Sequence, residues 1–232
     1  MASQNIINSA TATAIAEIVT LPICTIKTRY QNTQSNSIQQ TIKSIYRTSG
    51  IKAFYAASVP AISSQVLSTS SKYVLYRHFE DQHFSYSNKM FNGMISGIMS
   101  SLITHPIDSI KIHFQMNTSF MAQLKQHGIG LFYRGYSKTF SKTALGSSLF
   151  FPLYDYSNSL FNNPFYASFC SAVISTSIIH PLDYLKTRHI FGLPLYQGYN
   201  PITYYKGLTL NLLRVVPHFM IVMTTIDYLK LR

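Results

Sequence analysis

One short pattern occurs three times in this sequence, at residues 22–29, 106–113 and 181–188. Each copy begins with proline and an aliphatic residue, and each places lysine five positions after the proline. The two intervals between the prolines are 84 and 75 residues. An aromatic turn follows every copy, at residues 54–57, 132–135 and 204–207. Two patterns that recur in the same order indicate tandem units, which we place at 1–83, 84–160 and 161–232 within one integral domain.

Each unit is expected to contain two long helices. The predicted ranges are 4–31, 58–81, 88–116, 137–158, 164–190 and 208–231. Only 11% of the residues are charged, and residues 91–105 and 162–180 carry no Lys, Arg, Asp or Glu. Ser, Thr, Asn and Pro interrupt these stretches, which suits helices that face lipid on one side and a water-filled cavity on the other. The sequence thus predicts an all-α membrane protein with six transmembrane helices in three pseudo-threefold repeats around a central cavity.

Short amphipathic segments are expected between the two long helices of a unit. Residues 38–46 and 120–124 place apolar side chains at helical spacing, which is typical of helices lying along a membrane surface. The equivalent segment of the third unit, residues 191–204, contains Gly192, Pro194, Gly198 and Pro201. We do not expect a helix there.

Composition argues against several other classes of protein. The net charge of +12 comes from Lys and Arg spread along the chain in no dense run, so we expect membrane lipid and no nucleic-acid polymer as a partner. Cys24 and Cys170 form no disulfide or zinc framework. No Gly-rich phosphate loop, metal-ligand spacing or nucleophile elbow is present, so we expect neither an enzyme nor a cofactor or metal site. Residues 1–16 contain no Lys or Arg, so internal targeting is expected.

The three motif prolines, Pro22, Pro106 and Pro181, stand inside predicted helices. Because proline removes a backbone donor, each of these helices is expected to kink there. His105 and His180 directly precede two of the prolines, and we expect them to be packing residues rather than ligands.

The repeated proline, acid and base pattern, followed by an aromatic, basic and glycine turn, resembles the mitochondrial carrier family over essentially the whole chain. The resemblance implies a monomeric, multi-pass protein of the mitochondrial inner membrane, with its short surface helices on the matrix side. It further implies that a small anionic solute is moved by alternating-access exchange.

The resemblance also implies a gate of ion pairs that closes the matrix end of the cavity. Asp108 should pair with Lys186, and Asp183 should pair with Lys27. Lys111 is expected to lack a carboxylate because its partner position holds Cys24. We therefore expect two pairs rather than three.

Gln31 and Gln115 occupy the positions where the family places a bracing glutamine below an ion pair. Each follows its motif lysine by four residues, which puts it on the same helix face. These two braces are expected to offset part of the missing pair.

The gate at the cytoplasmic end is predicted to be irregular. Asp155 and Lys230 form the one regular pair, whereas Asp227 and Arg77 lack partners at the positions that the family uses.

The resemblance places the substrate contacts seven residues after the last position of each aromatic turn. These residues are Ser64, Lys142 with the adjacent Thr143, and Arg214. Lys138 lies one turn from Lys142, and Lys72 lies two turns beyond Ser64, so both are expected to face the same cavity. Glu17 is the main opposing charge.

Three readings of the function stay open. The pair Lys142 and Thr143 is similar to that of carboxylate carriers. The cluster of Lys72, Lys138, Lys142 and Arg214 would instead match a polyphosphate, with Phe150 and Tyr154 available to stack on a base. We favour exchange of nucleotides or deoxynucleotides, with a carboxylate or keto-acid carrier as the alternative. The substitution at Cys24 also keeps open a membrane adaptor that no longer transports.

Two of the aromatic turns are similar to the cardiolipin-binding elements of the family. They contain Arg134 with Gly135 and Lys206 with Gly207, so cardiolipin is expected as a bound lipid at both. The first turn ends in two alanines and lacks both the base and the glycine.

Overall fold

The computed structural model describes residues 2–33, 37–81 and 89–230, and every regular element within them is a helix. The six long helices are α1 (Ala2–Asn32), α3 (Ser58–Asp81), α4 (Lys89–Gln115), α6 (Tyr136–Phe161), α7 (Pro164–Phe191) and α8 (Leu208–Lys230). The shorter elements are α2 (Ile38–Ser49), α5 (Phe120–His127) and the 3₁₀ turns η1 (Ile51–Tyr55), η2 (Ile129–Tyr133) and η3 (Pro201–Tyr205).

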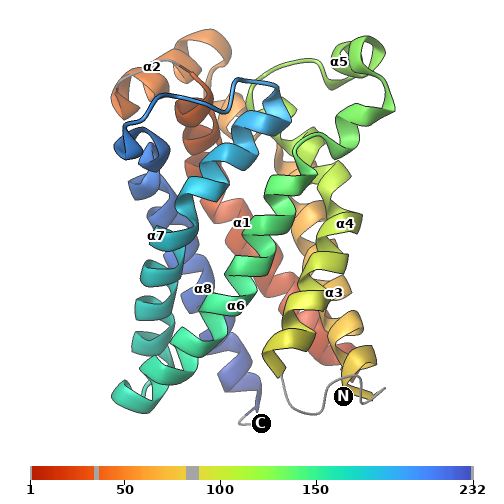
Figure 1. Ribbon diagram of the computed structural model, residues 1–232, viewed down its shortest axis with the longest axis vertical. Helices are drawn as coiled ribbons and strands as arrows, with labels where there is room; N and C mark the ends of the chain where they lie inside the picture. The colour runs from red at the N-terminus through yellow and green to blue at the C-terminus, as the bar shows by residue number, and fades with distance from the viewer. Residues whose placement is uncertain (1, 34–36, 82–88, 231–232) are drawn as a thin grey trace.

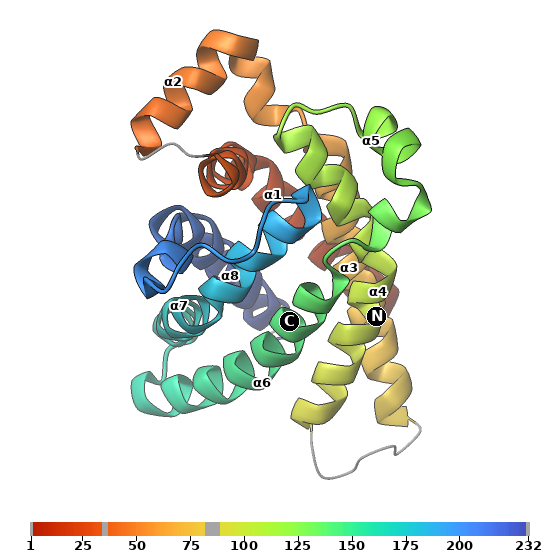
Figure 2. The same ribbon diagram turned by 45° about the horizontal axis from the view of Figure 1, so that its top comes forward.

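The six long helices form a closed ring. Each packs against its neighbours in chain order, and α8 returns to pack against α1 (Figure 2). The short helices α2 and α5 lie at one end of the ring, which also holds the three repeated motifs (Figure 1). We call this the motif end. The all-helical class predicted from the sequence is confirmed.

The predicted ranges of the long helices agree with the structure within three residues at each described end. The two surface segments are also helical, although α2 and α5 each continue three residues beyond the predicted range. In the third unit the described residues between α7 and α8 form no α-helix, as expected. The 3₁₀ turn η3 begins at Pro201, and the side chain of Asn200 accepts a hydrogen bond from the Ile202 amide.

The motif prolines lie inside continuous helices: Pro22 in α1, Pro106 in α4 and Pro181 in α7. The structure adds Pro152 inside α6 and Pro217 inside α8. Each proline removes one donor from the helical ladder. The kinks themselves stay a prediction.

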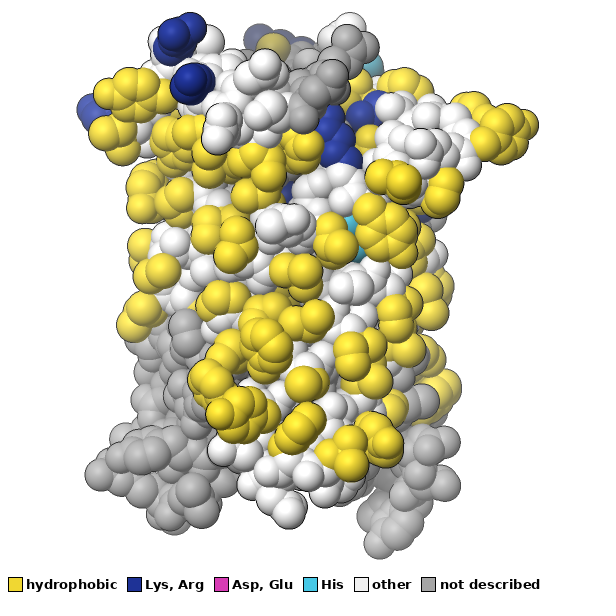
Figure 3. All heavy atoms as spheres, turned by 90° about the vertical axis from the view of Figure 1, so that its left-hand side faces the viewer, with side chains coloured by type: hydrophobic (Ala, Val, Ile, Leu, Met, Phe, Trp, Pro, Cys, Tyr) yellow, Lys and Arg dark blue, Asp and Glu magenta, His cyan; other side chains and the backbone are white. Residues whose placement is uncertain are grey.

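The outer surface of the ring is rich in apolar side chains. Ile15, Val19, Ile178 and Leu213 are all more than half exposed. Figure 3 shows one side of the molecule, where hydrophobic side chains cover much of the described middle and Lys and Arg gather toward the motif end. By length and hydropathy, one helix among the described residues, Phe165–Phe191, qualifies as a membrane span. Six crossings therefore stay a prediction.

Two buried histidines tie the aromatic turns to the helices. His105 bonds through Nε2 to the Arg134 carbonyl at 3.1 Å, and its Nδ1 lies 3.1 Å from Thr139 Oγ1. In the third unit His180 makes the same two bonds, to the Lys206 carbonyl and to Asn211. Both rings are fully buried, which confirms their packing role.

The first unit replaces this polar contact with an apolar one. Leu21 stands at the histidine position and Ala61 at the position of Thr139, and both are fully buried. The chain thus contains two solutions to the same packing problem. Either solution avoids a buried polar group without a partner.

This comparison predicts the effect of a substitution in the second unit. His105→Leu leaves the Arg134 carbonyl and the Thr139 hydroxyl without their partner, so we expect the unfolding temperature to fall by about 5 °C. His105→Leu with Thr139→Ala copies the first unit and should recover part of that loss. Thermal unfolding of the detergent-purified protein measures both. A double variant less stable than the single one contradicts the comparison.

Candidate functional site

A cavity of about 240 Å³ lies inside the helix ring near the motif end. Its walls carry two carboxylates, Asp108 and Asp183, while Glu17 is completely buried beside them. The cations that line it are Lys27, Lys72, Lys111, Lys142, Lys186 and Arg214. Such a concentration of charge inside a helix bundle with an apolar outer surface marks a candidate functional site.

Both ion pairs expected from the motif are present. Lys186 Nζ lies 2.7 Å from Asp108 Oδ2 and joins α7 to α4. Lys27 pairs with Asp183 and joins α1 to α7, and the two side chains are 5% and 6% exposed. These contacts link helices from different units at the motif end.

The expectation that Lys111 lacks a carboxylate is wrong. Its ammonium lies 2.5 Å from Oε1 of Glu17, which joins α4 to α1. Glu17 stands seven residues before Cys24, about two helical turns away on the same face. The prediction failed because it considered only the motif position, whereas the partner comes from elsewhere on the helix.

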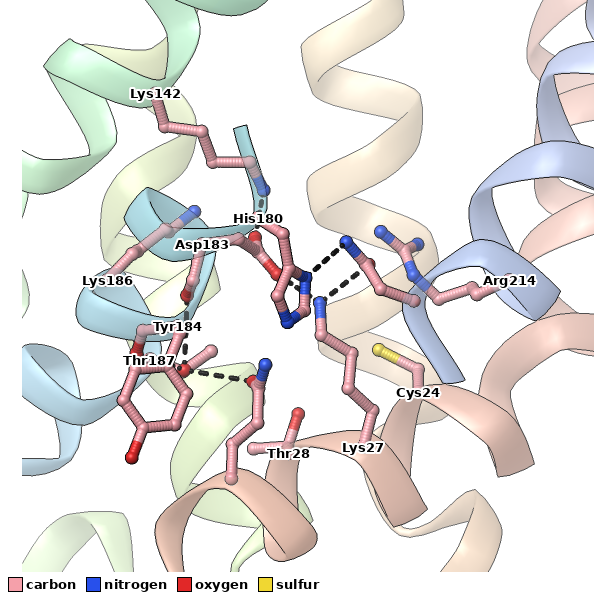
Figure 4. A network of polar contacts seen from close by, with 12 residues as sticks. Cys24, Lys27, Thr28, Lys142, His180, Asp183, Tyr184, Lys186, Thr187 and Arg214 are labelled. Carbon is pink, nitrogen blue, oxygen red and sulfur yellow. Dashed lines mark hydrogen bonds and ion pairs between the residues drawn. The ribbon is translucent and has the colours of Figure 1, made fainter. Parts of the chain in front are cut away.

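The predicted substrate contacts bind the same three carboxylates. Ser64 Oγ donates to Asp108 Oδ1 at 2.6 Å. Lys142 pairs with Asp183 from the side opposite Lys27 (Figure 4). Arg214 reaches Glu17, with its guanidinium nitrogen 3.7 Å from Oε2. Each carboxylate therefore holds one motif lysine and one predicted substrate contact, an arrangement that the sequence analysis did not foresee.

The two additional lysines differ in position. Lys72 lines the cavity as predicted, and it makes no hydrogen bond or ion pair with another described residue. Thr143 also lines the cavity. Lys138 does not, and its charge acts instead on His189. The first turn of α6 packs against the end of α7, where Gly135 approaches Ile190, and a cavity-facing Lys138 stays a prediction.

The two glutamines cross to the neighbouring helix and do not bond the lysines above them. Gln31 Oε1 accepts a hydrogen bond from Thr187 Oγ1 at 3.1 Å. Thr187 stands one helical turn after Asp183, which pairs with Lys27. Gln115 Oε1 accepts one from Thr28 Oγ1 at 2.7 Å. Both glutamine side chains are buried and bond across to a neighbouring helix, while their bracing role stays a prediction.

Sequence reasoning missed two further features near the gate. Asn211 Oδ1 accepts a hydrogen bond from Lys27 Nζ at 2.8 Å. Gln115 Nε2 donates to Cys24 Sγ at 3.3 Å, so the thiol is held at the motif level by a neutral contact. A threonine stands four residues after both Cys24 and Asp183. This recurrence could have predicted the hydroxyls of Thr28 and Thr187, which bond the two glutamines.

The other end of the cavity is described only in part. Asp155 is exposed on α6 and forms no ion pair with another described residue. The side chains of Arg77, Asp227 and Lys230 lie outside the described part of the structure. The prediction for this gate is therefore not tested.

The cations of the aromatic turns make contacts within the protein. Lys206 Nζ donates at 2.8 Å to the carbonyl of Thr33, just beyond the end of α1. The same ammonium lies 4.7 Å from the centre of the Tyr30 ring. Burial and the nearby Arg188 lower the pKa of Lys206. The Arg134 guanidinium packs against Gly192, just after α7. Both cations thus join one unit to the next.

Gly135 and Gly207 allow these turns to pack closely. Their φ angles are +79° and +85°, a region that favours glycine. A Cβ atom at Gly135 would lie 3.1 Å from the Ile190 side chain, and one at Gly207 would lie 3.3 Å from Gln31. The glycines therefore have a packing role whether or not lipid binds beside them.

Comparison with known proteins fits this geometry. The family model described as mitochondrial carrier protein matches residues 2–87 and 82–165. A mitochondrial carrier-like protein of Acanthamoeba polyphaga mimivirus is 63% identical over 226 residues, which cover 97% of this chain and 95% of the relative.

More distant relatives include mitochondrial thiamine pyrophosphate carrier 1 of Meyerozyma guilliermondii. It is 25% identical, over 88% of this chain and 85% of the relative. Mitochondrial substrate carrier family protein W of Dictyostelium discoideum is also 25% identical, over 93% of this chain and 82% of the relative. The threefold motif, the charged cavity that it surrounds and these matches lead to one conclusion: the chain belongs to the mitochondrial carrier family, whose members are transporters of the mitochondrial inner membrane.

Proposed function

We propose that this carrier exchanges a metabolite with several negative charges, with nucleotides or deoxynucleotides as the favoured class. The proposal rests on the charge balance of the cavity. Six cations face three carboxylates, and each carboxylate is already paired with one motif lysine. The cations that remain are Lys72, Lys142 and Arg214.

A net excess of three positive charges inside a membrane protein is costly unless an anion or water compensates it. A diphosphate offers about three charges at neutral pH, because a terminal phosphate carries roughly two and each inner phosphate one. Arginine binds phosphate oxygens in a bidentate manner, and lysine provides a point charge. A dicarboxylate would leave one cation without a partner.

The size of the cavity supports binding of the charged part of such a substrate. Its volume of about 240 Å³ lies just under the usual range for whole small molecules, about 300–1,000 Å³. We expect the phosphates near Lys142 and Arg214, with the base toward the opposite end, in the direction of Tyr154 on α6. The side chain of Phe150 lies outside the described residues. The relatives named as thiamine pyrophosphate carriers also handle a diphosphate, as their name states.

Exchange follows from alternating access. Opening the motif end, which the family resemblance assigns to the matrix, requires three ion pairs to separate. A ligand shifts such an equilibrium only by its differential affinity for the two states. We infer that the empty carrier opens slowly and rests with its motif end closed. Cardiolipin at the turns of Arg134 and Lys206 would stabilise that end further.

One observation favours a second candidate. Lys142 and Thr143 both line the cavity and together form the side-chain pair that resembles carboxylate carriers. A carboxylate or keto-acid substrate is therefore the alternative.

A ligand screen separates these candidates. Detergent-purified protein is heated with nucleoside mono-, di- and triphosphates, the matching deoxynucleotides, thiamine pyrophosphate, dicarboxylates, keto acids and phosphate. Each nucleoside without phosphate is the matched control. We expect stabilisation to appear with the diphosphates and to be absent with the nucleosides, since a ligand that binds only the folded state raises its unfolding temperature. Counter-exchange in liposomes then tests transport. Stabilisation by carboxylates alone would replace the substrate class, and no stabilisation or exchange would favour an adaptor.

A further inference from the structure

The first unit exchanges two side chains relative to the other two units. In the second and third units, the acid stands two residues after the motif proline and a hydroxyl, Ser101 or Thr176, stands five residues before it. In the first unit, Cys24 stands at the acid position and Glu17 at the hydroxyl position. The unit has not lost its carboxylate but carries it seven residues earlier.

Helical geometry explains how the moved carboxylate still reaches its partner. Seven residues make almost two turns, so Glu17 and Cys24 share one face of α1, with Glu17 about 10 Å deeper in the bundle. Lys111 bends toward it and brings its ammonium to 2.5 Å. Ser101 and Thr176 are small and buried, which fits positions that carry no ion pair.

Two cations lie beside the Glu17 carboxylate. The side chain is completely buried, and Oε2 makes no hydrogen bond with a described residue. Lys111 and Arg214 are the charged groups that contact it, at 2.5 Å and 3.7 Å. A buried carboxylate stays ionised only when such partners are present.

We propose that Glu17 is the third gate carboxylate of this carrier, moved from the motif to a buried position beside the cavity, where it couples the gate lysine Lys111 to the substrate contact Arg214. The gating role rests on the proposed transport function, whereas the pairing rests on the structure. A substrate anion at Arg214 takes one cation from Glu17 and places a negative charge beside it. The contact between α4 and α1 therefore weakens when substrate binds.

The stability test returns the carboxylate to the motif position. Glu17→Gln leaves Lys111 buried without a carboxylate, and we expect the unfolding temperature to fall by about 10 °C. Adding Cys24→Asp supplies the acid that the other units have, and should restore at least half of the loss. Cys24→Ser is the matched control, since it changes the same side chain without adding charge, and it should restore nothing.

A transport readout separates gating from simple stabilisation. In liposomes, Glu17→Gln should raise efflux without counter-substrate by about tenfold relative to exchange, because the closed gate is weaker. In Glu17→Gln with Cys24→Asp the leak should fall again. The freed Arg214 should then lower the half-saturating substrate concentration below that of the natural sequence.

Two results would overturn the proposal: an unchanged unfolding temperature in Glu17→Gln, or equal recovery with Asp and Ser at position 24. If Glu17→Gln alone does not fold, the comparison rests on the two double variants, with Cys24→Asp and with Cys24→Ser. If neither double variant folds, the result counts against the proposal. If the natural sequence moves no solute, the proposed function fails, while the thermal comparison still tests the pairing.

Discussion

Asp183→Asn is expected to lower the unfolding temperature of this carrier by about 10 °C or more and to abolish exchange. Asp183 is the one described carboxylate that pairs with two lysines, Lys27 and Lys142. Asparagine keeps the shape but removes the charge, so both ammonium groups lose their counterion. Removing one partner of a buried pair typically costs about 3–5 kcal/mol. Lys27 retains its bond to Asn211, which limits the loss.

Asp108→Asn is the variant whose fall in unfolding temperature is compared with that of Asp183→Asn. Asp108 is 24% exposed, against 6% for Asp183, and its second partner is the neutral hydroxyl of Ser64. We expect a smaller fall in unfolding temperature, and an equal or larger one would contradict this account.

Adding Lys142→Ala to Asp183→Asn removes one lysine that has lost its counterion and should recover part of the stability, as a double-mutant cycle will measure. Asp155→Asn, at the opposite end, should reduce transport less than Asp108→Asn.

Lys142→Ala and Arg214→Ala are expected to have the opposite profile, a large loss of exchange with little change in stability. Their carboxylates keep a second cation, Lys27 for Asp183 and Lys111 for Glu17. Each lost contact to a charged substrate is worth about 1.5–3 kcal/mol, which corresponds to a loss of about 10- to 100-fold in exchange at low substrate concentration. Initial rates in liposomes, read beside thermal unfolding, measure both quantities.

Lys138→Ala provides the matched control for Lys142→Ala. The two lysines stand one turn apart on α6, but only Lys142 lines the cavity. Exchange should therefore persist in Lys138→Ala. A loss as large as that of Lys142→Ala would show that position 138 faces the substrate after all.

The helices and two of the ion pairs were predictable because the motif recurs. Proline and lysine stand in the same register in all three units and the acid in two of them. The family resemblance then implies that Asp108 pairs with Lys186 and Asp183 with Lys27. Glu17 escaped this reasoning because it stands outside the register. Its contact depends on how far the Lys111 side chain bends, which no sequence spacing encodes.

The orientation of Lys138 was likewise decided by packing. A residue that stands four positions before a cavity-facing lysine should lie on the same face of the helix. At the first turn of α6, however, Gly135 brings the backbone against α7, and Lys138 is not among the residues that line the cavity. Helical periodicity locates a face only where the helix meets the same neighbours along its length.

The closure of α8 on α1 has a consequence for biogenesis. Lys27 finds its partners Asp183 and Asn211 at separations of 156 and 184 residues. In a linear repeat protein each unit contacts only the next, and partial arrays can fold. Here a buried lysine of α1 has its counterion on α7, 156 residues later in the chain. During synthesis Lys27 therefore lacks its counterion until α7 has been made.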